Sequence, residues 1–224
     1  MRVKQLFDAV SSTYTYLLLD EESKQAVIID PVDTEVEKYL QELQNYYLKL
    51  ILDTHIHADH VTGAALLKKK TDAKYGLRAQ INGVDIVLYN NQVITIENIN
   101  IKIVTTPGHT PESVCFLVDT VVFTGDTLLI GKCGRTDFQG GSAEQLYDSV
   151  HQQLLTLPDS TIIYPGHEYE SKTHSTIGWE RKHNSCLAHK TRAEFIEIMN
   201  NLNLPRPKMM DVAVPANMKC GRRD

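Results

Sequence analysis

Residues 54–60 read Thr-His-Ile-His-Ala-Asp-His, which places three imidazoles and one carboxylate within six positions. The stretch directly follows the apolar segment 48–52, which reads as a strand, and directly precedes a helical pattern over residues 60–70. Because residues two apart on an extended segment point to the same side, His55 and His57 can converge, while the last two polar residues lie on the turn into the helix. The spacing predicts a turn that aims four metal ligands at one spot.

Three later segments repeat this placement of a ligand-type residue just after an expected strand. They are Thr-Thr-Pro-Gly-His-Thr at 105–110, Thr-Gly-Asp at 124–126 and Tyr-Pro-Gly-His at 164–167. In layered α/β sheets that edge is the usual location of binding crevices. The seven candidate ligands are His55, His57, Asp59, His60, His109, Asp126 and His167. The remaining histidines lack this placement, and we expect them to be solvated or to cap helices: His151, His174, His183 and His189.

Composition limits the classes of protein to consider. The chain has 224 residues, 42% of them hydrophobic and 23% charged, which is ordinary for a globular domain, so we expect one domain over residues 1–224. The net charge of -5 gives no general field for nucleic acid, and no apolar run approaches the roughly 18 residues of a membrane span. Four scattered cysteines without a Cys-x-x-Cys pair or signal sequence predict a reducing, cytoplasmic location.

Hydrophobic periodicity predicts strands and helices in uneven alternation, which favours a layered α/β fold over an all-parallel barrel. Asp33 is the expected cap of a helix through Leu43, and Ser142 with Gln145 has the spacing of a capping box. Residues 168–184 read as a polar stretch, and a Pro-broken tail follows residue 200. The expected strands cover 14–20, 26–30, 48–52, 74–78, 92–96, 101–105, 113–119, 121–124 and 161–164; further helices cover 60–70 and 191–200.

The ligand set by itself fits two kinds of chemistry. Seven ligands could hold two divalent ions about 3.5–4 Å apart with a bridging hydroxide, an arrangement that hydrolyses thioesters, lactams or phosphodiesters. Two histidines and one carboxylate could equally hold a single Fe(II) with open positions for O₂ and a substrate. The number of ligands does not choose between these sites.

The order and spacing of the motifs resemble the metallo-β-lactamase fold superfamily, which implies a four-layered αββα sandwich. More narrowly, THIHADH, TPGHTPES, TGDTLLIGKCGRTDFQ, YPGHEY and the final EIMNNLNLPRPKMMDVAVPANMKCG are similar to the persulfide dioxygenase family, a relative of glyoxalase II, from about Leu17 to Gly221. Glyoxalase II is expected to carry a longer helical carboxyl-terminal domain than the short helix and tail after His167. The resemblance therefore favours the dioxygenase.

The resemblance implies a role for individual residues of this chain. His55, His109 and Asp126 match the family's ligands for one Fe(II) per chain. Four pocket residues match positions that orient ligands or carry protons without binding iron: His57, Asp59, His60 and His167. Arg135 and Tyr169 match positions that hold the glutathione moiety. Alternatives from the residues themselves are a salt bridge between Arg135 and Asp137 and core packing of Tyr169.

The implied reaction converts glutathione persulfide, O₂ and water to glutathione and sulfite. The resemblance also suggests a homodimer and an upstream rhodanese-type sulfurtransferase. Two alternatives remain: a dizinc thioester hydrolase of glyoxalase II type, and a non-catalytic metal-binding module. Glu168 departs from the aspartate expected after the motif histidine; Cys133 is expected to pack as a small hydrophobe, and Cys220, in an exposed tail, to be oxidisable.

Overall fold

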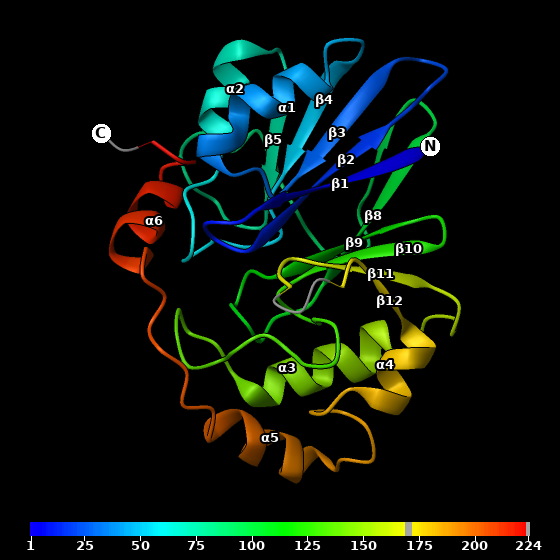
Figure 1. The fold of residues 1–224 in the computed structure, drawn as a ribbon, viewed down its shortest axis with the longest axis vertical. Coiled ribbons are helices and arrows are strands. Elements are labelled where there is room, and N and C mark those ends of the chain that lie inside the picture. Colours follow the sequence, from blue (N-terminus) through cyan, green and yellow to red (C-terminus); the bar gives the residue numbers. More distant parts are fainter. Residues whose placement is uncertain (169–171, 223–224) are drawn as a thin grey trace. The chain divides into compact units, whose positions relative to one another are not determined.

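The computed structural model describes residues 1–168 and 172–222. The chain forms two compact units, coloured along the sequence in Figure 1. Unit 1 contains Met1–Leu88, Val93–Ile101 and Arg206–Asp224, and unit 2 contains Tyr89–Gln92 and Lys102–Pro205. That the whole chain acts as a single domain stays a prediction.

The sheet of unit 1 has six strands in chain order, β1-β2-β3-β4-β5-β6. The first three are antiparallel neighbours, and the pairs from β3 onward are parallel. The strand β1 was not expected from the sequence, because only its last residues are buried and its apolar pattern is correspondingly weak. The bounds are β1 Arg2–Asp8, β2 Thr13–Leu19, β3 Gln25–Ile29, β4 Tyr47–Leu52, β5 Lys74–Leu77 and β6 Ile86–Val87.

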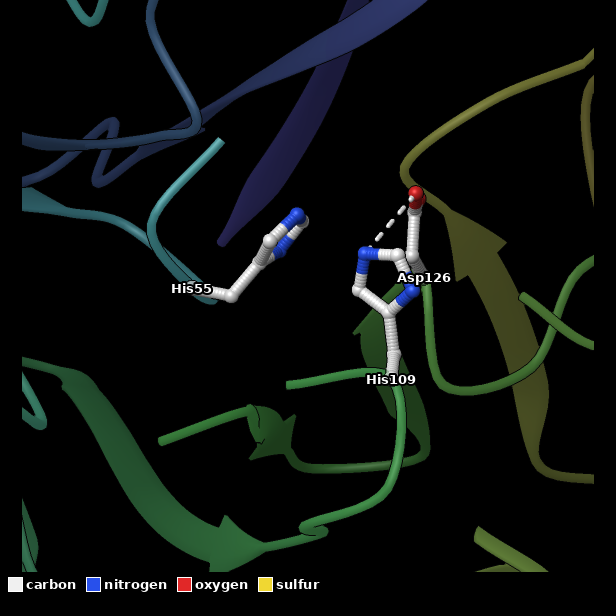
Figure 2. Close-up of side chains that lie close together, drawn as sticks. All are labelled: His55, His109 and Asp126. Atoms are coloured by element: carbon white, nitrogen blue, oxygen red, sulfur yellow. Dashed lines mark ion pairs between the residues drawn. The ribbon is translucent and has the colours of Figure 1, made fainter. Parts of the chain in front are cut away.

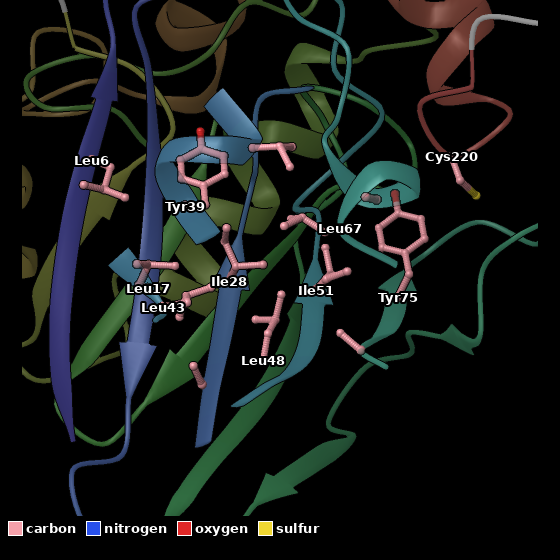
Figure 3. Packing of buried hydrophobic residues seen from close by; sticks show 14 of the residues in the cluster. Leu6, Leu17, Ile28, Tyr39, Leu43, Leu48, Ile51, Leu67, Tyr75 and Cys220 are labelled. Carbon is pink, nitrogen blue, oxygen red and sulfur yellow. The ribbon is translucent and has the colours of Figure 1, made fainter. Parts of the chain in front are cut away.

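Two helices, α1 (Val36–Glu42) and α2 (Ala64–Lys70), supply apolar side chains to the core of unit 1. Tyr39 of α1 and Leu67 of α2 pack with strand residues such as Ile28 in the cluster shown in Figure 3. Burial of these side chains, each contributing about 1.5–3 kcal/mol, fixes the helices on the sheet. The carboxyl ends of β3 and β4 are thereby held as a rigid base for the loops that follow them.

Two boundaries in unit 1 differ from the sequence expectation. The helix α2 begins at Ala64 rather than at residue 60, because the carbonyl of Val61 and the N–H of Gly63 bond instead to the segment after β3. Asp33 lies in a 3₁₀ turn, Asp33–Glu35, and the residue at the N-cap of α1 is Glu35, which makes no side-chain cap bond. The predicted Asp33 cap was wrong.

The second sheet has the order β12-β11-β10-β9-β8-β7, and the boundary between the units falls within β8. β10 and β11 are parallel, whereas β10 with β9, β9 with β8, and β11 with β12 are antiparallel. Parallel pairing brings the carboxyl ends of β10 and β11 to the same edge, which is where two candidate ligands follow. The bounds are β7 Val93–Ile96, β8 Ile99–Thr105, β9 Val114–Val118, β10 Val121–Gly125, β11 Ile162–Pro165 and β12 Ser175–Thr176.

Three helices supply side chains to the core of unit 2: α3 (Ala143–Ser149), which continues as a π-helical turn to Leu154, α4 (Ile177–His183) and α5 (Arg192–Asn200), which packs against α3. The predicted cap of α3 is confirmed, since the Ser142 hydroxyl accepts a hydrogen bond from the Gln145 backbone N–H. α4 falls in the stretch read as polar, where its short buried face was too small to show as a periodic pattern.

A sixth helix, α6 (Met210–Asn217), belongs to unit 1. The sequence was read there as a Pro-broken tail, but Pro215 lies in the last turn of the helix, and Ala213 and Ala216 pack against Val61. Small residues give a weak hydrophobic signal, so only the packing reveals this helix. Across the described ranges 1–168 and 172–222, we find no helix with the length and apolar character needed to cross a membrane.

Candidate metal centre

In unit 1, the segment between β4 and α2 collects three histidine rings. The side chains of His55, His57 and His60 are buried, with 4% or less of each residue exposed. Ring centroids lie 4.2 Å apart for His55 and His57 and again 4.2 Å apart for His57 and His60. The structure therefore brings these three predicted ligands together on one turn, as the spacing indicated.

The Asp30 carboxylate, at the end of β3, organises the start of this turn. It accepts hydrogen bonds from the Thr54 backbone N–H at 2.7 Å and from the Thr54 hydroxyl at 2.9 Å. His57 Nε2 donates to the same carboxylate at 3.1 Å. Because the Thr54 hydroxyl donates to Asp30, it accepts from Nδ1–H of His55 at 3.0 Å, which leaves the lone pair of His55 on Nε2.

Asp59 and His60 form the other side of the turn. His60 Nδ1 lies 2.8 Å from an oxygen of Asp59, and the same oxygen accepts from the Thr13 hydroxyl at 2.9 Å. One ligand-type atom from each of His57, Asp59 and His60 falls within 4.8 Å of the others. This subset by itself has the donors and the spacing to take up a cation.

Two buried carboxyls, Asp30 and Asp53, lie beneath the turn and were missed by the sequence analysis. Burial raises the pKa of each to about 6, partly offset by the imidazoles of His55 for Asp30 and His57 for Asp53. Tyr75 donates its hydroxyl to Asp53 at 2.7 Å. Both aspartates directly follow a buried strand, so the strand-end pattern that found the other ligands was available to find them as well.

In unit 2, Asp126 lies between two histidines on the edge formed by β10 and β11. His109 Nε2 lies 3.6 Å from one carboxylate oxygen of Asp126, the pair joined by the dashed line in Figure 2. His167 Nδ1 lies 2.7 Å from the other oxygen. His109 donates Nδ1–H to the carbonyl of Arg135 at 2.7 Å, which leaves its lone pair on Nε2. A histidine oriented through its other nitrogen is the usual arrangement for a metal ligand.

Two glycines permit the backbone to pack closely around Asp126. A Cβ on Gly134 would lie 1.9 Å from the carbonyl oxygen of Asp126, and one on Gly166 would lie 2.7 Å from its Oδ1. Neither approach is open to any other residue. The Cys-Gly-Arg motif thus packs against the backbone of Asp126, and the Pro-Gly-His motif packs against its carboxylate.

Comparisons of the sequence and of the structure with known proteins agree on one family. The Metallo-beta-lactamase superfamily profile matches residues 9–83 and 77–167. The mouse protein "Persulfide dioxygenase ETHE1, mitochondrial" is 43% identical over 98% of this chain and 88% of its own length. The crystal structure of ETHE1 from Myxococcus xanthus aligns with a TM-score of 0.97 and 46% identity, covering 99% of this chain and 100% of that one. This chain belongs to the persulfide dioxygenase family of the metallo-β-lactamase superfamily.

Membership establishes the metallo-β-lactamase fold expected from the sequence, an αββα sandwich. It also makes the chain an enzyme of a dioxygenase family. A more distant relative, hydroxyacylglutathione hydrolase of Pelagibacter ubique, is 36% identical over 90% of this chain and 84% of its own length. The superfamily therefore includes a hydrolase close enough in sequence to be weighed against the dioxygenases.

Arg135, which the family resemblance assigns to substrate, makes the salt bridge that the sequence also suggested. Nε and one terminal nitrogen donate to the two oxygens of Asp137 at 2.6 and 2.7 Å, and the guanidinium lies over the ring of Phe138. Its other terminal nitrogen donates to the carbonyl of Pro205 at 2.7 Å. The Arg135 side chain pulls the pKa of Asp137 below its usual value. Tyr169 lies outside the described residues.

The remaining sequence expectations concern three single residues. Cys133 is buried in the core cluster of unit 2, which confirms its packing role. The Cys220 thiol is also buried, with its pKa raised to about 11 by burial, so the expectation of an exposed thiol was wrong. Glu168, the departure from the motif, is buried with 4% of its surface exposed.

Proposed function

We propose that this protein is an iron-dependent persulfide dioxygenase that converts glutathione persulfide, O₂ and water to glutathione, sulfite and two protons. The observation that carries the proposal is its nearly full-length similarity to persulfide dioxygenases. The imidazole and carboxylate donors described above are consistent with that chemistry, since two histidines and one carboxylate suit non-haem Fe(II).

We assign the iron to His55, His109 and Asp126, the side chains drawn in Figure 2. Two features of the separate units support the assignment. Both histidines have Nδ1 engaged, by Thr54 and by the Arg135 carbonyl, so that each offers Nε2. When bound, Fe(II) supplies affinity for a soft sulfur donor together with redox chemistry toward O₂.

The other polar residues then act by orientation and proton handling. His167 at 2.7 Å from Asp126 holds the carboxylate in one rotamer, and its imidazole can keep or release a proton there. His57 is held by Asp30, and Asp59 and His60 form a hydrogen-bonded pair. These residues carry the hydrogen bonds around the metal-binding donors of their own units. Water enters the balanced reaction as a reactant.

Arg135 and Tyr169 are assigned to the glutathione moiety. The bidentate contact with Asp137 fixes the plane of the guanidinium, and the permanent positive charge of that group suits a nearby peptide carboxylate. Arg135→Ala should raise KM for glutathione persulfide more than it lowers kcat. A variant with unchanged KM would remove Arg135 from the substrate site and leave it with the salt bridge alone.

Metal analysis with oxygen uptake tests the function. Protein purified without added metal should contain roughly one iron per chain and consume one O₂ per glutathione persulfide, with release of sulfite. His55→Ala, His109→Ala and Asp126→Ala should lose iron and oxygen uptake together, while His183→Ala, at an exposed histidine, should keep both. Two zinc ions per chain with hydrolysis of a glutathione thioester would replace the proposal by the hydrolase.

The assembly and cellular context are proposals that follow from the family resemblance. We propose a homodimer, a rhodanese-type sulfurtransferase as the source of the persulfide, and a cytoplasmic location. Four free, buried cysteines support a reducing compartment, but the name of the mouse relative places that protein in mitochondria, another location to be tested. Light scattering on the purified protein and fluorescence localisation of the full chain test these assignments.

A further inference from the structure

We propose that Asn217, the last residue of α6, is a positioning residue that holds the backbone of the metal-ligand turn 55–60 and so controls how firmly the protein retains its metal. The inference rests on the proposed function only in that the turn binds a metal. The inference is the same whether the bound metal is iron or zinc.

The Asn217 side chain makes three hydrogen bonds to the turn and its exit. Its Oδ1 accepts from the backbone N–H of Thr62 at 2.9 Å. Its Nδ2 donates to the carbonyl of His57 at 2.9 Å and to the carbonyl of His60 at 2.9 Å. Both amide hydrogens and the amide oxygen are therefore used, and Asn217 is buried, with 2% of its surface exposed.

The turn needs such a partner because most of it is buried and it lies outside the helices and strands of unit 1. Buried carbonyl and N–H groups must be paired, and leaving one without a bond costs about 1–3 kcal/mol. The primary amide of an asparagine is a small group that can donate two hydrogen bonds and accept a third. Asn217 thus replaces, from 155–160 residues away in the sequence, the ladder bonds that a strand would have supplied.

The position of the amide is itself fixed by the segment that carries it. Ala213 and Ala216 pack against Val61, and the carbonyl of Cys220 accepts from the Ala65 N–H at 3.1 Å. Gly221, at φ +85°, lies so close that an added Cβ would be 2.2 Å from the Thr62 carbonyl oxygen. The carboxyl-terminal segment is therefore docked on both sides of Asn217, before and after it in the chain.

This arrangement acts on the metal through the ligands. Fixing the carbonyls of His57 and His60 fixes the backbone of the short turn that begins with the proposed iron ligand His55, and it also holds the histidines that surround that ligand. Loss of a group that orients metal ligands typically costs 10–100-fold in metal affinity. We therefore expect Asn217 to slow metal release without contacting the metal.

The experiment compares metal release with stability in three variants. Asn217→Asp has the same shape and keeps an acceptor for Thr62 but presents oxygen to two carbonyls. Asn217→Gln keeps the amide and displaces it by one methylene. Val214→Ala is the matched control, because Val214 lies on the same helix and packs against the core of unit 1 without sharing the amide bonds. Release of total metal to a chelator and the denaturant midpoint are measured for each.

The expected result is metal release at least 10-fold faster for Asn217→Asp than for Val214→Ala when the two are compared at equal stability, with Asn217→Gln intermediate. Should Asn217→Asp fail to fold, faster release from Asn217→Gln than from Val214→Ala at equal stability carries the same conclusion. Release at the wild-type rate in the Asn217 variants, or release that follows stability alone in all variants, would overturn the proposal. Zinc in place of iron would count against the proposed dioxygenase but leave this comparison intact.

Discussion

Replacing Gly134 by alanine should remove metal binding through one added methyl group. The Cβ would lie 1.9 Å from the carbonyl oxygen of Asp126, 2.9 Å from its carbonyl carbon and 3.1 Å from its Cβ, whereas ordinary van der Waals contact begins at 3.4 Å. The two nearest obstructing atoms belong to the backbone and the third is bonded directly to it, so none can rotate away as the end of a flexible side chain would. Either the loop at 133–135 or Asp126 itself must move.

The expected cost follows from this geometry. Overpacking a core typically costs 1–3 kcal/mol, and a clash with backbone belongs at the upper end, so we expect a loss of about 3 kcal/mol in the free energy of unfolding. For a chain of this size that corresponds to a fall of roughly 6–12 °C in Tm. Displacement of Asp126 should also abolish metal retention.

The assay combines thermal unfolding with metal content after dialysis, and Gly131→Ala is the control. At Gly131 an added Cβ has open space, with Trp179 no nearer than 3.8 Å, but φ is +75°, which costs about 1–2 kcal/mol for a residue with a side chain. The control should be destabilised yet keep its metal. A Gly134→Ala protein with wild-type Tm and full metal content would refute the reasoning.

Three other predictions concern separate features of unit 1. Thr54→Val, which removes the bridge between Asp30 and His55, should weaken metal affinity 10–100-fold by chelator competition, and unchanged affinity would contradict the assigned tautomer. The hydrogen bond from Ser23 lowers the pKa of Asp20 from 3.8 to about 2, so the carboxylate stabilises the folded protein above pH 3.8 and this contribution is lost as pH falls through 2. Asp20→Asn should make the free energy of unfolding less dependent on pH over that interval. An unaltered acid-unfolding profile would count against this role of Asp20. Cys220, with its pKa near 11, should be about 0.1% thiolate at pH 8, against about a quarter for an ordinary thiol. An alkylating reagent should therefore modify Cys220 at least 100-fold more slowly in the native protein than in the denatured protein. Peptide mapping after alkylation measures this ratio.

Local patterns were sufficient to predict most strands and the ligand types. Alternating or continuous apolar runs located β2 to β5 and β7 to β11, because strands concentrate hydrophobic residues over a short distance. The strands β1, β6 and β12 and the helices α4 and α6 were missed. Each buries only a few side chains, so packing decides its structure more than any periodic signal.

The candidate site likewise has residues that the sequence could predict and residues that only the packing reveals. The histidines of residues 54–60 could be found from their spacing, since an extended segment followed by a turn constrains neighbouring side chains directly. Asp30 and Asn217 could not be assigned their roles in this way, because each bonds to the turn from a position far away in the chain. Sequence spacing carries no information about a hydrogen bond between such distant residues.

The amino-acid sequence by itself determined the ligand types, their places after buried strands and the resemblance to a family. These properties follow from local periodicity and from the chemistry of individual side chains. Only the tertiary structure decided which nitrogen of His109 is engaged, why Gly134 must lack a side chain, and how a carboxyl-terminal helix comes to brace the ligand turn. Those outcomes depend on the close packing of distant segments, where a few tenths of an ångström separate a contact from a clash.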